Sequence, residues 1–240
     1  MKIRRRCLFL LLAVFIVLIS GVVEACAFDT GFETVELPEK EKSEFISNIN
    51  LELLKSEPAK NPIKCFDVNS NHLIAIGQNT SNRRTVCVYT EEGVFQYGYS
   101  FDCDGDFGLE WDENNLNIYF VRSRLIISVT ASGSVSDVLE VPKTSKNNSY
   151  INRYIHSYKK QIEDTEYCIE NDFGLLNCFA TAFSRITVKN SMGEKRVIYD
   201  VSSMQLLNMI TILAFVIVFV GIFVALIVRQ IRKARSIAKD

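Results

Sequence analysis

The stretch VCVYTEEGVF (residues 86–95) places a run of apolar residues before an acidic pair and Gly93, after which Val94 and Phe95 resume the apolar pattern. Two short apolar runs separated by a turn predict a β-hairpin. The glycine supplies the positive φ angle that a tight hairpin turn requires. This unit predicts a fold built mainly from antiparallel β-strands.

The hairpin unit recurs along the chain. ISVTASGSV (residues 127–135) repeats it with Gly133 in the turn, and ITVKNSMGEKRVIYDV (residues 186–201) repeats it again. Ahead of the first two units, FDVNSNHLIAIG (residues 66–77) aligns with WDENNLNIYFV (residues 111–121): an aromatic residue, an aspartate, a polar turn and an apolar strand. Gly93 and Gly133 are 40 residues apart, and a four-stranded propeller blade has a similar length.

With these repeats, residues 64–142, and in part residues 185–201, resemble β-propeller blades of the NHL or TolB-like kind. The resemblance implies antiparallel, blade-like sheets. A closed propeller typically needs at least about four blades, whereas this chain contains two and a partial third. We therefore expect unpaired strand edges to be covered by helices, to curl on themselves or to pair with another subunit.

Two segments have helical periodicity. In residues 39–55, Phe45, Ile46, Ile49 and Leu53 form one apolar stripe on a charged helix. A second helix is predicted over residues 150–162, capped by Asn148 or Ser149. Its stripe either packs on the sheet or binds a partner through tyrosines. The residues of this stripe are Tyr150, Ile151, Tyr154, Ile155, Tyr158 and Ile162.

The C-terminal region contains an apolar segment without charge, LLNMITILAFVIVFVGIFVALIV (residues 206–228). At about 1.5 Å per residue such a helix reaches roughly 34 Å, enough to cross a bilayer core of about 30 Å. Positive residues next to a span stay in the cytoplasm, so Arg229, Arg232, Lys233 and Arg235 predict a cytoplasmic C-terminus.

The N-terminal region predicts export. A basic segment, KIRRR (residues 2–6), precedes an apolar core at residues 8–19, as in secretory signals. Ala25 and Ala27 favour cleavage after Ala27, retention as an anchor is the alternative, and lipidation at Cys26 is a third interpretation. The expected organisation is a signal peptide or signal anchor at 1–27, an extracytoplasmic β-rich domain at 28–203, a transmembrane helix at 204–228 and a basic cytoplasmic tail at 229–240.

Charge is segregated along the chain. Residues 28–205 contain 18 lysines and arginines against 26 aspartates and glutamates, a net charge of −8, whereas each basic end carries +4. An acidic domain lacks the basic face that nucleic-acid binding requires, so we expect no nucleic-acid partner. Scarce proline with frequent Asn, Lys and Ile resembles proteins of AT-rich Gram-positive bacteria.

The outer domain has five cysteines, so an odd thiol is left over if disulfides form. A disulfide between Cys168 and Cys178 is one interpretation. The other is that the cysteines act as small buried apolar residues in strands, as Cys87 does in the hairpin unit.

The densest acidic stretch is FDCDGDFGLEWDE (residues 101–113). Its spacing resembles a calcium-binding loop, because Ca²⁺ takes hard oxygen ligands at alternate positions. Phe107 stands where such a loop requires glycine, so a solvated acidic turn is the alternative. The candidate ligands are Asp102, Asp104, Asp106, Glu110 and Glu113.

Catalytic motifs are missing from the sequence. We find no G-x-S-x-G, H-E-x-x-H, Walker A or G-x-G-x-x-G pattern. His72 and His156 are expected at the surface. The basic pairs Arg83-Arg84 and Lys159-Lys160 are also expected in solvent, with contact to anionic lipid or wall polymer as the alternative.

The sequence therefore favours a membrane-anchored, non-catalytic interaction or sensing module outside the cytoplasm. Its expected partners are the membrane and another membrane or envelope protein, with oligomerisation open. One alternative is an envelope hydrolase that uses the carboxylates of residues 102–113. Another is an accessory subunit of a membrane complex, with Asn208 and Gly221 on a helix-packing face.

Overall fold

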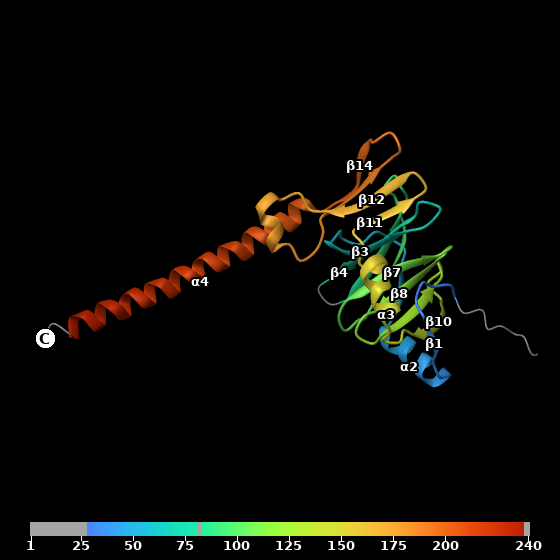
Figure 1. The fold of residues 1–240 in the computed structure, drawn as a ribbon, viewed down its shortest axis with the longest axis horizontal. Helices are drawn as coiled ribbons and strands as arrows, with labels where there is room; N and C mark the ends of the chain where they lie inside the picture. The colour runs from blue at the N-terminus through green and yellow to red at the C-terminus, as the bar shows by residue number, and fades with distance from the viewer. Residues whose placement is uncertain (1–27, 81–82, 238–240) are drawn as a thin grey trace, which may run out of the picture.

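The computed structural model of the chain describes residues 28–80 and 83–237, which form a β-rich domain and one long helix that leaves it (Figure 1). The strands are β1 (Val35–Glu36), β2 (Glu52–Leu54), β3 (Ile63–Val68), β4 (Ile74–Asn79), β5 (Arg84–Tyr89), β6 (Phe95–Phe101), β7 (Phe107–Asp112), β8 (Asn115–Phe120), β9 (Leu125–Val129), β10 (Val135–Glu140), β11 (Lys159–Ile162), β12 (Thr165–Glu170), β13 (Arg185–Lys189) and β14 (Lys195–Asp200). The helical elements are α2 (Glu39–Ile49), α3 (Ser145–Tyr150), the π-helical turn η1 (Ile151–Ile155), the 3₁₀ helix η2 (Gly174–Phe179) and α4 (Ser202–Ile237).

The strands form three antiparallel sheets. Sheet 1 has the order β2-β6-β5-β4-β3, sheet 2 the order β1-β10-β9-β8-β7 and sheet 3 the order β11-β12-β13-β14. Each contains four consecutive strands that pair as an up-and-down meander. The last turn of each meander holds a glycine with positive φ, at Gly93 (80°), Gly133 (85°) and Gly193 (83°), which confirms the expected role of these glycines.

Sheet 1 lies between the other two sheets. One face packs on sheet 2 through residues such as Val86, Phe101 and Leu116, and the opposite face packs on sheet 3 through residues such as Ile76, Tyr89 and Tyr167. These two apolar layers form the core of the domain. Burial on both faces explains why the central strands read as nearly continuous apolar runs.

The two outer faces of this stack are covered in different ways. On sheet 2, the N-terminal segment around Phe32 and the α3–η1 segment bury Tyr119 and Ile126. On sheet 3, the outer face is polar and carries ion pairs between Lys159 and Glu166 and between Lys195 and Glu170. Within residues 28–80 and 83–237 the sheets close into neither a barrel nor a propeller. The polar face of sheet 3 ends the stack as a capping repeat does.

The third repeat is larger than the sequence indicated. Only its second half was expected as a hairpin, but β11 and β12 complete a four-stranded sheet. The predicted helix over residues 150–162 is therefore wrong beyond η1. Its stripe is divided, because Tyr150, Ile151 and Ile155 pack on sheet 2 while Ile162 packs in the layer between sheets 1 and 3. Thr144, rather than Asn148 or Ser149, caps α3 by accepting a hydrogen bond from the Asn147 N–H at 3.1 Å.

The first predicted helix is also shorter than expected. It ends at Ile49 rather than at residue 55, because Asn50 takes a left-handed conformation with φ 45°. The chain then enters β2, where Leu53 pairs with Tyr99 of β6. Pairing with the edge of sheet 1 thus replaces the last turn of the predicted helix.

The helix α4 is 36 residues long and follows β14 after the single residue Val201. Its segment Ser202–Ile227 is long and apolar enough to cross a membrane, and none of the most apolar window is buried against the domain. Figure 1 shows α4 projecting alone from the end of the domain next to sheet 3. The prediction for residues 1–27 lies outside the described residues.

Candidate functional site

A buried ion pair lies where the three sheets meet. Lys160 Nζ of β11 is 2.9 Å from Asp67 Oδ1 of β3, and the two side chains are 5% and 1% exposed. The Trp111 backbone N–H of β7 donates to Asp67 Oδ2 at 2.8 Å, and its indole N–H donates to the Asp67 carbonyl at 3.3 Å. Because each strand belongs to a different sheet, this one carboxylate joins all three.

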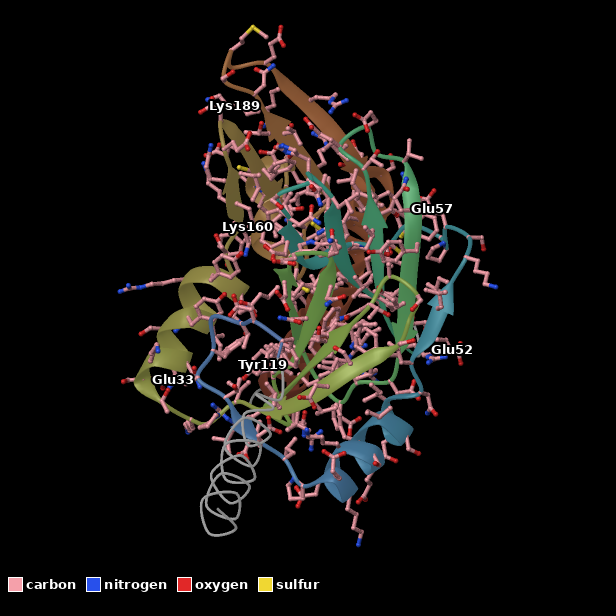
Figure 2. All side chains as sticks on the ribbon, turned by 90° about the vertical axis from the view of Figure 1, so that its right-hand side faces the viewer. Glu33, Glu52, Glu57, Tyr119, Lys160 and Lys189 are labelled. Atoms are coloured by element: carbon pink, nitrogen blue, oxygen red, sulfur yellow. The ribbon has the colours of Figure 1, made fainter. Side chains whose placement is uncertain are left out.

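The expectation that Lys160 lies in solvent is wrong. β11 alternates, so that Lys160 and Ile162 point inward while Lys159 and Gln161 are exposed. The ammonium group also donates to the Tyr154 carbonyl at 2.9 Å and lies 3.4 Å from the centre of the Tyr154 ring. Both Lys160 and Lys189 belong to sheet 3, and Figure 2 shows Lys160 at mid-height of the domain and Lys189 nearer its upper end.

A second buried carboxylate, Glu110 of β7, lies beside this pair. It accepts hydrogen bonds from the Gly31 N–H (2.7 Å), the Thr30 hydroxyl (2.5 Å) and the Tyr150 hydroxyl (2.6 Å). Burial raises the pKa of Tyr150, and so does its hydrogen bond to Glu110, which keeps the phenol protonated as a donor. Burial likewise raises the pKa of Asp67, against the attraction of Lys160.

The aspartates at matching positions of the two repeats, Asp67 and Asp112, both accept a hydrogen bond from a neighbouring element. Asp67 accepts from the backbone of sheet 2, and its counterpart Asp112 accepts from the Asp29 N–H at 3.0 Å. In each case the carboxylate fixes the element that packs next in the stack. In both units this residue lies at the end of the first strand of the meander, β3 or β7, just before the polar turn.

A pocket of about 230 Å³, the junction pocket, opens where the three sheets meet. Tyr158 stands at its rim with 61% exposure, and its ring centre is 5.1 Å from that of Phe183. Side chains from all three sheets and from η1 contribute to the wall. The lining residues are Lys64, Cys65, Asp106, Phe107, Ile155, His156, Ser157, Tyr158, Ile169, Thr181 and Phe183.

One loop connects this pocket to the start of α4. The Thr181 carbonyl accepts from Lys64 Nζ at 3.0 Å, and the next carbonyl, that of Ala182, accepts from Gln205 Nε2 at 2.6 Å. The Ser184 carbonyl accepts from the Val201 N–H at 2.9 Å. Residues 181–184 therefore touch the pocket and the first turn of α4 at the same time, and no flexible linker separates the two.

The five acidic candidates do not form one site. Asp102 receives a hydrogen bond from Asn50 and pairs with Arg83, and together with Asp104 it lines a pocket of about 450 Å³ beside α2. Asp106 faces the junction pocket instead, Glu110 belongs to the buried cluster, and Glu113 is exposed in the β7–β8 turn with φ 49°. In the described part of the chain, no three His, Cys, Asp or Glu residues are placed to hold a metal ion. The residues do not fit the predicted calcium loop.

The cysteines from Cys65 to Cys178 are free, which disagrees with the interpretation that Cys168 and Cys178 form a disulfide; Cys65 and Cys87 are buried in strands, as in the other interpretation. Burial raises the pKa of Cys87 to about 12 and that of Cys65 higher, which keeps both as unreactive thiols. His72 Nδ1 lies 2.7 Å from the Tyr167 hydroxyl, and His156 ends η1 at the pocket.

This arrangement supplies a recess with aromatic rings in its wall, next to a loop that holds the start of α4. No protein-family model, no curated protein and no solved structure matches this chain.

Proposed function

We propose that this protein is a membrane-anchored interaction or sensing module with a non-catalytic extracytoplasmic domain. In this proposal α4 crosses the membrane and the basic tail after it stays in the cytoplasm, which the cluster of Arg229, Arg232, Lys233 and Arg235 supports. The partner is another membrane or envelope protein. The resemblance to propeller blades is part of the proposal, and the three four-stranded meanders support it.

The observation that carries the proposal is the loop at residues 181–184. It contributes Thr181 and Phe183 to the junction pocket, and its carbonyls hold Gln205 and Val201 at the start of α4. A ligand that displaces this loop must also change how α4 leaves the domain. Ligands shift a protein toward the conformation that they bind more tightly, so occupation of the pocket is transmitted to the membrane segment.

The partner contact is placed at Tyr158. Tyrosine is enriched among residues that dominate binding energy at interfaces, because it buries a large surface at low entropic cost. At this position the ring is exposed, is held by Phe183 and adjoins a polar recess with Lys64 and Asp106. The hydrolase alternative has no comparable support, because the acidic candidates lie in separate surroundings.

The test is photocrosslinking in living cells with a benzophenone amino acid at position 158. The matched control carries the same group at position 192, because Met192 is 80% exposed in the β13–β14 turn, away from the pocket. We expect a discrete adduct with an envelope or membrane protein from position 158 only, which is lost when Lys64→Glu reverses the charge of the pocket wall. The same adducts from both positions, or none from position 158, would contradict the proposal.

A further inference from the structure

The length of α4 locates the outer boundary of the bilayer core. A span of about 30 Å requires about 20 helical residues. Counting these back from Arg229, the first charged residue after the apolar segment, places the outer boundary near Met209. Since the helix begins at Ser202, an untilted span that ends at Arg229 leaves its first two turns outside the hydrocarbon, at the level of the lipid headgroups.

At the level of the headgroups, one face of α4 is buried by the rest of the domain. Gln205 and Met209, one turn apart on the same face, are only 4% and 2% exposed, whereas Leu207 is 65% exposed. The Ala182 carbonyl receives the Gln205 side chain, and Figure 1 shows η2 lying beside the first turns of α4. The segment that follows η2 therefore contacts α4 at Gln205, one turn before the predicted boundary.

The sequence around η2, FGLLNCF (residues 173–179), contains no charge, and Leu175 at its tip is 94% exposed. Its polar groups are paired within the segment. Asn177 accepts from the Phe173 N–H at 3.1 Å and donates to the Asn171 carbonyl at 3.4 Å, and the Ala180 N–H donates to the Asn177 carbonyl. Internal pairing lowers the cost of moving a backbone out of water toward lipid.

We infer that η2 is a second membrane contact, in which Leu175 inserts among the lipid acyl chains at the outer boundary. This rests on the proposed anchoring by α4. The occupant is the bilayer itself, because η2 lies beside the first turns of α4, at the depth where the proposed span enters lipid. Contact at two points fixes the tilt of the domain and brings the loop at residues 181–184, which follows η2, next to the membrane.

Tryptophan quenching by brominated lipids tests this inference on the full-length protein in liposomes. The chain has one tryptophan, Trp111, so the wild-type emission is the baseline. Leu175→Trp adds the probe at η2. Met192→Trp is the matched control, since Met192 is also exposed but lies in the β13–β14 turn, at the opposite end of β14 from α4. Phe219→Trp, in the middle of the apolar segment, reports whether α4 is in the bilayer.

We expect the emission added by Leu175→Trp to be lost with bromine near the headgroup end of the acyl chain, and the emission added by Met192→Trp to persist. Phe219→Trp should lose emission with bromine deep in the chain. If Phe219→Trp is quenched but Leu175→Trp is no more quenched than Met192→Trp, the contact at η2 is refuted while the anchoring stands. If Phe219→Trp is not quenched, the anchoring and the contact fail together.

Discussion

Replacing Lys160 by methionine should destabilise the domain strongly, because it leaves the Asp67 carboxylate buried without its counter-charge. The side chain of Asp67 is 1% exposed, and only uncharged backbone donors, the N–H groups of Trp111 and Val68, would remain beside it. Breaking a buried pair in this way costs about 3–5 kcal/mol. For a domain of this size each kcal/mol lowers the unfolding midpoint by about 2–4 °C, so a decrease of about 6–20 °C is expected.

The pH dependence of the Lys160→Met variant has a defined sign. Burial raises the pKa of Asp67 in the folded protein, so the folded state holds this proton at a pH at which the unfolded state has released it. The free energy of unfolding therefore decreases as pH rises above the ordinary aspartate pKa of about 3.9. Removing the ammonium group strengthens this effect, so acidification from neutral pH should restore part of the lost stability.

Thermal unfolding of the full-length protein in detergent, followed by the emission of Trp111, measures both effects. Lys195→Met is the matched control, because its pair with Glu170 at 2.7 Å is exposed and should be worth no more than about 1 kcal/mol. The double variant Asp67→Asn/Lys160→Met should regain most of the loss and lose the pH dependence. The reasoning is refuted if Lys160→Met costs no more than Lys195→Met.

Three further outcomes are expected. Gly31→Ala should lower the free energy of unfolding by about 1–3 kcal/mol, because a Cβ there would lie 2.2 Å from Tyr150 Cζ and displace a donor of Glu110. Gly221→Ala is the control, because a Cβ there would meet no described atom within 4 Å and should not lower the free energy of unfolding. Gln205→Leu removes one of the two donors to the Ala182 carbonyl and leaves Asn171 Nδ2 at 2.9 Å, so it should cost about 0.5–1.5 kcal/mol and speed amide exchange at Ser184 and Val201; unchanged exchange would count against the docking of α4. Cys65 and Cys87 should resist maleimide until the protein unfolds, while an added Met192→Cys reacts at once, as peptide mass spectrometry can show.

Features set by neighbouring residues could be predicted from the sequence. The hairpins around Gly93, Gly133 and Gly193 follow from local turn chemistry, and their positive φ angles agree. The apolar segment of α4 follows from composition alone. Strands β1 and β2 could not be found, because they are two and three residues long and exist only through pairing with β10 and β6.

The candidate site was largely missed because its residues come together only in the folded chain. Asp67 and Lys160 lie far apart in the sequence. Lys160 also belongs to a pair of adjacent lysines, a pattern that is typical of exposed surface residues. The tyrosines of residues 150–158 have helical spacing, and nothing local shows that β11 starts soon after them. The alternation in Lys159–Ile162 was the available signal, but four residues are too few to separate a strand from a helix.

The most direct test of the account is the sidedness of the domain and of the tail in intact cells. Met192→Cys and Ser236→Cys variants are treated with a membrane-impermeant maleimide before and after permeabilisation, and the labelled peptides are identified by mass spectrometry. The account predicts that the cysteine at position 192 is labelled in intact cells and that the cysteine at position 236 is labelled only after permeabilisation. Labelling of position 236 in intact cells, with position 192 protected, would contradict it.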